Sequence, residues 1–591
     1  MEAHPRPGAK TWWSPGFNYT YRYTLQSVVA HPKSVPAPRR RKSKVAHHNG
    51  RTGWRITMIL DDLRSIQEEY GYLEESELRS YSHRSNIPLY RLYGLATFYP
   101  HLRLQPPSRV EVGVCRDLSC LLNRGSELQA KLGRAIDERP REGMELVQVS
   151  CLGQCEIAPA FSIEGASSGE EEKFIRNRIE ECGCMKDPRI EKPTTLLCNP
   201  YRDNSSFDAL RSFLEDPDPV RIITELKTSG LRGMGGAGFP TGLKWDIVSK
   251  AQGAPKYVIC NADESEPGTS KDRYILENLT DLVVEGLALA VAVIEAEYGI
   301  IYIREEYHDA REKLQKVLKR RMAEGLINTD DMPSIRLAVS PGGYICGEET
   351  ALFEALEDRR AEPRNKPPFP ADFGLFGKPT LINNVETLAM IPGIILNGGG
   401  WWASHGVWDA KGLKFLAVSG HVEKPGIYEV PLGIPFLDLL DLAGGTKDGK
   451  PLKAFSPGGA SSGFLPASFG DLPLEFAAVA KAGSMLGSGA VVVVSEGTDM
   501  LELALNVTDF FKRESCGKCV PCRVGCEKLV SMIERIRNGT GTPSDLDTIN
   551  DLSNAMMQAS ICGLGQAAPN AIRSVIQHFP EDIHAYMRGV S

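Results

Sequence analysis

The chain has 591 residues and an ordinary globular composition, which is enough for roughly three to five domains. Its formal net charge of −7 argues against a general nucleic-acid-binding protein, and no apolar run reaches the roughly 18 residues that span a bilayer. Most of the 14 cysteines fall in tight clusters, which favours metal binding in a reducing compartment, and hence a cytoplasmic protein, over a disulfide framework.

Residues 1–55 form a basic segment in which Glu2 is the only acidic residue. Arginines and lysines follow one another between Pro38 and Lys44. Such a segment has little apolar surface to bury, which predicts a disordered arm. An Arg-rich, acid-poor beginning is also typical of a transit peptide, and the sequence assigns the arm no function.

Helical periodicity runs over residues 56–104 and is followed by a predicted strand that ends at Cys115. Cys115 and Cys120 form one close pair, and a second strand-like run leads to Cys151 and Cys155. Two such pairs can converge on one site, where four thiolates suit an iron–sulfur cluster. Structural zinc is the alternative, although zinc sites usually use C-x2-C pairs and these spacings are longer.

Three motifs in this region point to a known family: Tyr-Gly-Leu-Ala-Thr-Phe-Tyr at residues 93–99, the C-x4-C pair and Cys-Leu-Gly-Gln-Cys. Together they resemble the thioredoxin-like [2Fe–2S] subunit of complex I and its soluble relatives. The resemblance implies a thioredoxin-like domain over residues 56–185 whose two cysteine pairs hold the cluster. Cys182 and Cys184 have no partner pair and are interpreted as linker thiols, with a metal role as the lesser alternative. Residues 186–204 are a predicted linker.

A glycine-rich run at residues 230–245, named the glycine loop below, is the most informative stretch of the chain. Its glycines allow positive φ and close approach to a ligand, and successive backbone N–H groups can form a nest for phosphate. Lys244 adds a positive charge and Phe239 an apolar ring, which together suit a phosphorylated cofactor with a flat ring. A flexible linker is the alternative. The candidate ligand-facing glycines are Gly233, Gly235 and Gly236.

Polar side chains follow predicted strands of an α/β region, at the position where such sheets bind ligands. The first set follows a strand at residues 256–260 and comprises Asn261, Asp263, Glu264 and Glu266. Three acids in four positions repel one another unless a ligand satisfies them, and an exposed acidic turn is the alternative. The second set comprises Tyr344, Gly347, Glu348 and Glu349, where a preference for acids at a helix start is the alternative. Later candidates are Lys366, Phe369, Asn383, Asn384 and Thr387.

These stretches resemble the flavin- and NADH-binding subunit of complex I and its soluble diaphorase relatives over most of residues 205–591. The resemblance implies a Rossmann-like α/β domain at residues 205–410 that binds FMN through Gly233, Gly235, Lys244, Asn261, Asp263, Asn383, Asn384 and Thr387. It implies that the flavin–NADH cavity is lined by Phe239, Glu264, Glu266, Tyr344, Glu348, Glu349, Lys366 and Phe369. The family usually has Arg where this chain has Met234.

The nucleotide preference follows from the acidic side chains. No G-x-G-x-x-G run with a distant acid is present. A carboxylate near the adenosine ribose can accept from a 2′-hydroxyl and repel a 2′-phosphate. The sequence therefore predicts NAD(H) over NADP(H), with Glu349 as the discriminating residue.

Short strands recur in residues 411–498, which resemble the small β-grasp domain of the same subunit and are interpreted as a scaffold, and residues 499–591 are predicted to be a helical domain. The helical part carries C-x2-C-x2-C, a strong [4Fe–4S] signal, in Cys516, Cys519 and Cys522. The fourth ligand is Cys526 or Cys562. The family motif Ser-Ile-Cys-Gly-Leu-Gly favours Cys562, and structural zinc is the lesser alternative.

The resemblance implies an NAD-dependent flavin and iron–sulfur oxidoreductase with FMN, NAD(H), a [2Fe–2S] and a [4Fe–4S] cluster. Flavin exchanges both electron pairs and single electrons, so no side chain is a required acid or base, and Glu264 and Glu266 position the hydride transfer. Residues 458–468 and 471–476 resemble the β subunit of soluble NAD-dependent formate dehydrogenases, which implies a molybdenum or tungsten α subunit as partner. The alternatives are the diaphorase subunit of an NAD-reducing hydrogenase, with a nickel-containing partner, or an NADH-dehydrogenase-like module. An iron–sulfur scaffold without flavin is the non-enzymatic alternative.

Overall fold

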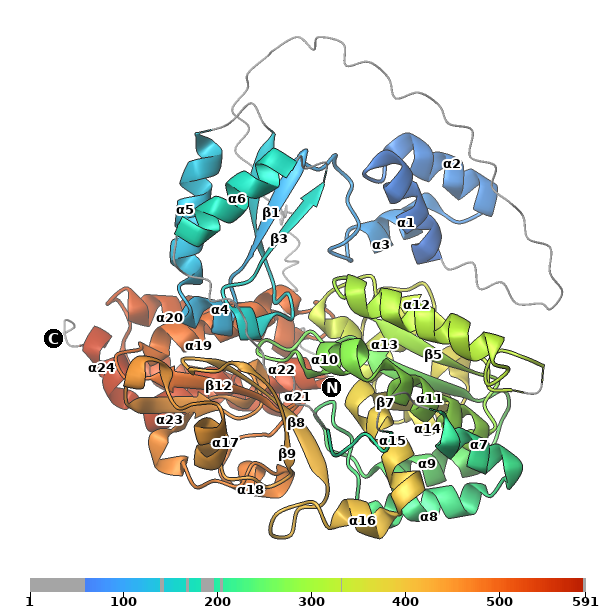
Figure 1. The fold of residues 1–591 in the computed structure, drawn as a ribbon. Helices are drawn as coiled ribbons and strands as arrows, with labels where there is room; N and C mark the ends of the chain where they lie inside the picture. Colours follow the sequence, from blue (N-terminus) through green and yellow to red (C-terminus); the bar gives the residue numbers. More distant parts are fainter. Residues whose placement is uncertain are drawn as a thin grey trace, which may run out of the picture. The chain divides into compact units, whose positions relative to one another are not determined.

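The computed structural model describes residues 59–138, 143–165, 169–181, 196–201, 206–330 and 332–587. All of them belong to one compact unit, Thr57–Ser591, whose helices and strands are drawn in Figure 1. The predicted basic arm, Cys182, Cys184 and most of the predicted linker lie outside the described residues. Within the described part, no helix has both the length and the apolar character needed to cross a bilayer.

The first described elements are three helices with one apolar side each: α1 (Ile59–Tyr70), α2 (Glu75–Ser85) and α3 (Leu89–Ala96). Leu63, Leu78 and Leu92, one from each helix, are fully buried in a common core. The backbone N–H of Leu60 also donates to Asp358 Oδ1 at 3.1 Å, so the three helices pack against the α/β region that follows.

A three-stranded sheet with the order β2-β1-β3 comes next. Its strands are β1 (Val110–Cys115), β2 (Met144–Val149) and β3 (Phe161–Gly165), joined by α4 (Leu118–Leu122), α5 (Gly125–Asp137) and η2 (Cys155–Ile157), and followed by α6 (Gly169–Glu181). β1 is parallel to β2 and antiparallel to β3. Val112 and Val114 bury their side chains against Leu128 and Leu132 of α5, so the apolar alternation of β1 builds this small core.

A four-stranded parallel sheet with the order β6-β5-β4-β7 forms the centre of the α/β region. Its strands are β4 (Tyr257–Ala262), β5 (Tyr298–Ile303), β6 (Ile335–Val339) and β7 (Thr380–Asn384). The helices before β4 and between β4 and β6 are α7 (Asp208–Glu215), α8 (Pro219–Ser229), α9 (Thr241–Lys250), α10 (Lys271–Asn278), α11 (Thr280–Ile294) and α12 (His308–Ala323). α11 is buried on nearly all sides, as expected for a helix with apolar residues around most of its circumference.

The rest of the α/β region supplies the helices that follow β6 and β7. They are η3 (Tyr344–Gly347), α13 (Glu349–Leu356), α14 (Pro370–Phe373), η4 (Leu375–Gly377), α15 (Val385–Asn397) and α16 (Gly399–Ala403). α15 packs extensively on α11, which covers one face of the parallel sheet. The carboxyl ends of the strands therefore open at one edge, where the polar segments of the sequence gather.

A five-stranded sheet with the order β11-β10-β12-β8-β9 follows. Its strands are β8 (Leu413–Gly420), β9 (Gly426–Pro431), β10 (Leu452–Ser456), β11 (Leu465–Pro466) and β12 (Ala490–Ser495). Its helices are α17 (Phe436–Leu442), η5 (Lys447–Gly449), η6 (Ala460–Ser462), η7 (Ala467–Phe469) and α18 (Phe476–Lys481). β8 and β12 pair in parallel while the other pairs are antiparallel. In the core of this region the ring of Phe436 stacks on that of Phe455, with 3.7 Å between the ring centroids.

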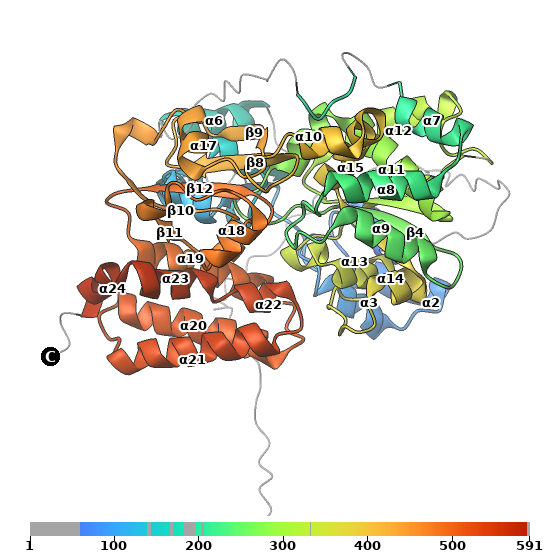
Figure 2. The ribbon, with the colours of Figure 1, turned by 90° about the horizontal axis from the view of Figure 1, so that it is seen from below.

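The chain then becomes wholly helical. The helices are α19 (Met500–Glu514), α20 (Val520–Arg537), α21 (Pro543–Ala559), α22 (Gly563–Ala567), α23 (Asn570–His578) and α24 (Pro580–Met587). Figure 2 shows α20, α21 and α23 grouped beside β10 and β11, and α23 contacts both β11 and η6. Cys519 and Pro521 stand at the start of α20, where proline is tolerated.

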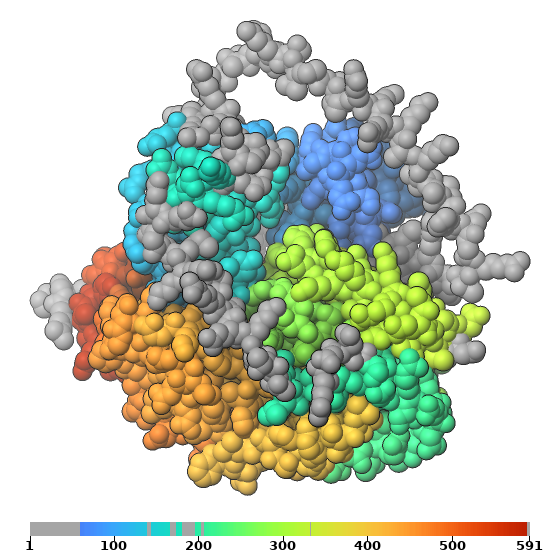
Figure 3. Space-filling view, in the orientation of Figure 1, coloured from blue at the N-terminus to red at the C-terminus, as the bar shows by residue number. Residues whose placement is uncertain are grey.

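The small three-stranded sheet and the five-stranded sheet contact each other through α4. Ser119 and Ser419 lie 2.9 Å apart through their hydroxyl oxygens, and Asn123 Nδ2 donates to the carbonyl of Gly420 at 3.1 Å. The two regions adjoin in the space-filling view of Figure 3, where they are cyan and orange. The predicted fold class, with a mixed small sheet, a parallel α/β sheet, a β-grasp-like sheet and terminal helices, is confirmed.

Candidate functional site

A cavity of about 440 Å³, named the central cavity below, opens beside the carboxyl ends of β4 and β7. Its volume is in the range of small-molecule sites. The predicted site residues that line it are Gly233, Gly235, Gly236, Phe239, Lys244, Asn261, Asp263, Glu264, Glu266, Tyr344, Gly347, Glu348, Glu349, Lys366, Asn383 and Asn384. Segments separated by more than a hundred residues therefore meet at one place, as expected for a bound cofactor.

Two predicted residues are not brought to this lining. Phe369 precedes α14 with 56% of its surface exposed. Thr387 is fully buried in α15, and its hydroxyl accepts from the backbone N–H of Met234 at 2.9 Å. The Thr387 hydroxyl thus anchors the backbone of the glycine loop without lining the cavity.

The glycine loop is closed on itself by backbone hydrogen bonds. The N–H of Gly233 donates to the carbonyl of Phe239 at 2.8 Å. A Cβ at Gly235 would lie 3.1 Å from the Cβ of Asn384, whereas a Cβ at Gly236, whose φ is +139°, would meet nothing within 4 Å. Gly236 therefore borders open space in the cavity, which leaves room for a ligand against the backbone.

Lys244 supplies the positive charge predicted beside this loop. Its Nζ donates to the carbonyl of Ile382 at 3.2 Å and lies 5.9 Å from the centre of the Phe239 ring. Burial lowers the pKa of Lys244, although Glu349 opposes the shift. A bound anion would restore the preference for the charged form.

The three acids of residues 263–266 are not an exposed acidic turn, because each carboxylate has its own set of donors. Asp263 accepts from Ser340 Oγ at 2.6 Å and from Ser265 Oγ at 2.7 Å, and burial raises its pKa to about 6. Glu264 accepts from the backbone N–H groups of Asp272 and Arg273, at 2.9 and 3.1 Å, at the start of α10. Burial raises the pKa of Glu264 to about 7. The repulsion expected from the sequence is relieved by turning the carboxylates apart.

Glu266 faces the five-stranded sheet. Its carboxylate accepts from Tyr344 Oη at 2.6 Å, from the backbone N–H of Ser461 at 2.7 Å and from Ser461 Oγ at 3.0 Å. Burial raises the pKa of Glu266, and these donors oppose the shift. Glu266, Tyr344 and Ser461 therefore form one hydrogen-bonded group in the cavity wall.

Glu348 and Glu349 have different roles. Glu348 accepts from the N–H groups of Thr350 and Ala351, both at 2.9 Å, and so caps α13, as the helix-start alternative predicts. Glu349 makes no such cap and forms an ion pair with Lys366, which also reaches Glu348 at 3.2 Å. Glu349 and Lys366 are each about one-third exposed, which places their charges where a ligand entering from solvent meets them.

The four predicted [2Fe–2S] cysteines come together as buried thiols. Cys151 Sγ lies 3.6 Å from Cys155 Sγ, and hydrogen bonds from Cys115 and Cys155 hold the pKa of Cys151 well below its ordinary value. The backbone N–H of Ala160 donates to Cys120 Sγ at 3.3 Å. The four thiols are 2% to 4% exposed, so the set is shielded from water.

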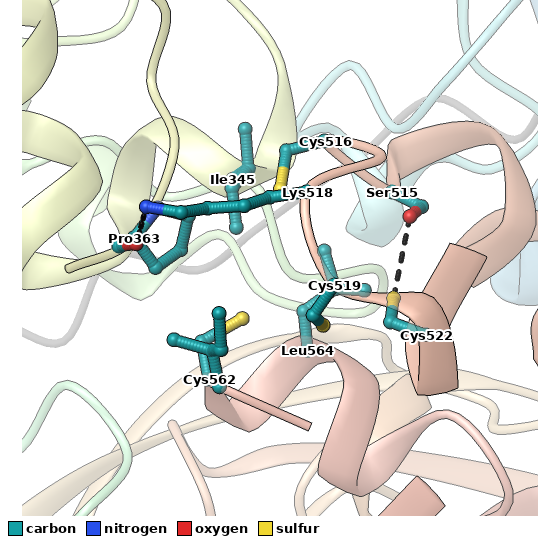
Figure 4. A pocket seen from close by; sticks show the side chains of 10 residues that line it. Ile345, Pro363, Ser515, Cys516, Lys518, Cys519, Cys522, Cys562 and Leu564 are labelled. Atoms are coloured by element: carbon teal, nitrogen blue, oxygen red, sulfur yellow. Dashed lines mark hydrogen bonds between the residues drawn. The ribbon is translucent and has the colours of Figure 1, made fainter. Parts of the chain in front are cut away.

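The second cysteine set surrounds a small cavity at the start of α20, named the cysteine pocket below (Figure 4). Cys516, Cys519 and Cys522 come from one segment and Cys562 from the segment before α22. Cys526 does not line this pocket; it is fully buried one helical turn after Cys522. Cys562, and not Cys526, therefore lines the pocket together with the other three.

No three His, Cys, Asp or Glu side chains of the described residues are arranged to hold a metal ion between them. Cluster thiolates do not share a single ion: two bind each iron of a [2Fe–2S] centre, and one binds each iron of a cubane. Both cysteine sets fit that chemistry, since each offers four thiols and neither is closed by a disulfide.

Four protein-family models match the chain. They are a thioredoxin-like [2Fe-2S] ferredoxin at residues 45–178, a Nuo51 FMN-binding domain at 226–393, an SLBB domain at 415–465 and an NADH-ubiquinone oxidoreductase-F iron-sulfur binding region at 502–586. The chain is 41% identical over 404 residues to the F 2 subunit of NADH-quinone oxidoreductase of Rhizobium meliloti (strain 1021), covering 67% of this chain and 96% of that protein. The chain belongs to the family of NADH-quinone oxidoreductase F subunits.

The chain is also similar to hydrogenase subunits. It is 38% identical over 428 residues to NADP-reducing hydrogenase subunit HndC of Solidesulfovibrio fructosivorans, covering 71% of this chain and 85% of that protein. A solved structure of NAD+-reducing [NiFe]-hydrogenase in the air-oxidized state matches with a TM-score of 0.77 and 30% identity, covering 89% of this chain and 93% of that chain. The prediction of a flavin and iron–sulfur oxidoreductase with FMN, NAD(H) and two cluster types is confirmed at the level of the family.

The five-stranded region also contributes to the lining of the central cavity, which its interpretation as a scaffold did not predict. Cavity-lining residues that the sequence did not indicate come from its loops, namely Gly458, Ser461, Met485, Gly487 and Ser488, and from the helices, namely Gly563, Leu564 and Ala567. The signal available in the sequence is the glycine–serine run at residues 458–463, which resembles a second glycine loop. Nothing in the sequence alone pairs that run with Glu266.

Proposed function

We propose that the chain is the diaphorase unit of a larger enzyme, exchanging a hydride between NAD(H) and FMN in the central cavity and single electrons with its two clusters. One observation carries this proposal: Ile345 and Leu564 line both the central cavity and the cysteine pocket. The two sites therefore have two lining residues in common and adjoin each other. Bound FMN supplies the exchange between electron pairs and single electrons.

The residues of the chain position the reactants in this proposal. The glycine loop, with Asn383 and Asn384 across from it, holds FMN, and the open space beside Gly236 fits it. Glu266 is held as an acceptor by Tyr344 and Ser461, so it orients the nicotinamide side and needs no change of protonation.

The segment that carries Cys151 is joined by hydrogen bonds to residues that line the central cavity. Arg304 donates from one Nη to the carbonyl of Glu264 and from the other to the carbonyl of Cys151, both at 2.6 Å. Glu514 accepts from Ser150 Oγ and from the backbone N–H of Tyr344, both at 2.8 Å. These contacts support an electron exchange in which the flavin lies between both clusters.

We propose a formate dehydrogenase as the larger enzyme, with a molybdenum- or tungsten-containing subunit as partner. The support is the amino-acid sequence of residues 458–468 and 471–476. The first of these two segments contains Ser461, which lines the central cavity. An NAD-reducing hydrogenase with a nickel-containing partner is the second candidate, favoured by the match over most of this chain to a hydrogenase structure. A cytoplasmic location is proposed from the free thiols, which a reducing compartment preserves.

Purification of the native complex tests both levels of this proposal. The expected preparation contains FMN and iron–sulfur clusters, and NADH bleaches its visible absorbance. Copurification of a pterin-containing subunit would support formate as the substrate of the larger enzyme. Copurification of a nickel-containing subunit would support hydrogen instead. A preparation that holds iron and sulfide but no flavin, and does not respond to NADH, would establish the scaffold alternative.

Replacing Glu349 by glutamine is expected to relax the choice of nucleotide. The carboxylate stands partly exposed at the rim of the cavity, where it would repel a 2′-phosphate. The ratio of kcat/KM for NADPH to that for NADH is expected to rise about tenfold, which corresponds to roughly 1.4 kcal/mol. Asp372→Asn, an exposed acid outside the lining, is the matched control, and an unchanged ratio in Glu349→Gln would assign the selectivity elsewhere.

A further inference from the structure

Four charged side chains are buried together next to the central cavity. Lys271 and Asp272 belong to α10, Glu386 to α15 and Lys414 to β8. Their side chains are 0%, 4%, 0% and 0% exposed, and they are called the buried charge network below. Two positive and two negative groups make its formal charge neutral.

Each ammonium group of the network has three acceptors. Lys271 Nζ lies 2.7 Å from Asp272 Oδ1, 2.9 Å from Glu386 Oε2 and 3.3 Å from Asn384 Oδ1. Lys414 Nζ lies 2.7 Å from Glu386 Oε2, 2.9 Å from the carbonyl of Ser488 and 3.2 Å from that of Phe415. Glu386 therefore receives both lysines on one oxygen, and its other oxygen accepts from the N–H of Phe415 at 2.8 Å.

Stability alone does not account for such a network. Removing charges from water costs several kcal/mol per ion, and apolar replacements of similar volume are often neutral or stabilising. In some proteins, buried ionic groups of this kind instead fix one particular geometry. The question is which geometry this network fixes.

One end of the network reaches the cavity at Asp272 and Asn384, which both belong to its lining. Asn384 Nδ2 donates to Asp272 Oδ2 at 2.6 Å, and Asn384 Oδ1 accepts from Lys271 and from the backbone N–H of Glu386 at 3.0 Å. The Asn384 amide is thereby fixed in one orientation. A Cβ built on Gly235 would lie only 3.1 Å from the Asn384 Cβ, so the position of Asn384 also limits that of the glycine loop.

The other end of the network belongs to the five-stranded sheet. Lys414 lies on β8 and holds the carbonyl of Ser488, a residue of the cavity wall. Ser488 Oγ is also 2.7 Å from Thr269 Oγ1, which lines the cavity from the α/β side. The network therefore joins the two walls of the cavity that come from different sheets.

We propose that the buried charge network is a positioning device for the flavin site, in which Lys414 of the five-stranded sheet sets, through Glu386, Lys271 and Asp272, the place of Asn384 and Gly235. This inference rests on the proposed binding of FMN in the central cavity. It adds that FMN retention depends on a lysine that does not itself line the cavity. Lys414 is a positioning residue, because it acts through the others.

The test uses the full chain with both clusters assembled and measures FMN dissociation by the fluorescence of released flavin. Lys414→Met keeps the side-chain volume and removes the charge, and the FMN Kd is expected to rise about tenfold or more. The electron paramagnetic resonance spectra of both clusters are expected to match wild type. The matched control is Lys453→Met, because Lys453 also joins the five-stranded sheet to another region, through Asp582 at 2.7 Å, away from the cavity.

The outcomes separate this inference from the function on which it rests. A wild-type chain with both clusters and no FMN binding would refute the proposed function itself. Wild-type FMN affinity in Lys414→Met would refute the positioning role, as would an equal loss in Lys453→Met. Should Lys414→Met fail to assemble its clusters, the isosteric Glu386→Gln decides: weaker FMN binding with both cluster spectra intact supports the inference, and unchanged FMN affinity overturns it.

Discussion

Replacing Cys562 by serine is expected to remove or strongly alter the [4Fe–4S] cluster, whereas Cys526→Ser is expected to leave it in place. Cys562 lines the cysteine pocket with Cys516, Cys519 and Cys522, and a cubane takes one thiolate at each iron. Cys526 lies in the core of the helical region and donates a hydrogen bond to Cys522, which lowers the pKa of Cys522 to about 7. We therefore expect the Cys526 thiol to support Cys522 and not to bind the cluster itself.

The measurement is iron content together with the low-temperature electron paramagnetic resonance signal of the reduced protein. Cys562→Ser is expected to lose up to four irons per chain and the cubane signal, with the [2Fe–2S] signal retained. Cys526→Ser is the matched control, a cysteine-to-serine change at a buried sulfur near the same cluster. A complete cubane in Cys562→Ser, with loss in Cys526→Ser, would reverse the assignment.

Much of this site follows from local sequence, since the information lies within a few residues. C-x2-C-x2-C places three thiols at one helix start, whatever the rest of the fold. The glycine loop likewise closes through contacts of its own, such as that between Gly233 and Phe239. The parallel sheet is predictable because apolar strands alternate with helices.

Other parts of the site could not be read from local sequence, because they depend on contacts between distant segments. Ser461 reaches Glu266 across 195 positions of the chain, and no local pattern encodes that pairing. The same holds for Cys562, which the spacing alone leaves open against Cys526 and only the family motif favours. The sequence predicts Thr387 to lie near the site, but it does not say which way the hydroxyl points. In the structure the hydroxyl faces the glycine loop and accepts from the backbone N–H of Met234.

The acidic side chains show how burial separates residues that look alike. Glu264, Glu348 and Glu349 are all predicted to line one cavity, and they do. Yet Glu264 and Glu348 also accept from backbone N–H groups at helix starts, a use that lowers the cost of a buried carboxylate. Glu349 makes no such cap and pairs with Lys366, which also reaches Glu348; because its carboxylate is not engaged by backbone N–H groups, it is the one assigned to nucleotide choice.

Gly236→Val is expected to abolish FMN retention while both clusters remain. Gly236 is the loop glycine whose Cβ would meet no protein atom within 4 Å, so a side chain there occupies space that the cavity reserves for its ligand. FMN affinity and NADH-dependent dye reduction are expected to fall about a hundredfold, equivalent to roughly 3 kcal/mol of binding. Flavin content, both cluster signals and dye reduction are measured on the same preparation.

Backbone strain is the competing explanation, because φ at Gly236 is +139° and a β-branched residue is strained there. Gly483→Val separates the two effects: Gly483 has a φ of +80°, is exposed, and also has open space around it, but it does not line the cavity. Strain alone would lower the melting temperature of both variants, and at Gly236 it would also disturb the glycine loop, so melting temperature is measured together with FMN content. Loss of FMN from Gly236→Val at a melting temperature no lower than that of Gly483→Val supports a ligand in the space beside Gly236, and full FMN content in Gly236→Val would place the flavin elsewhere in the chain.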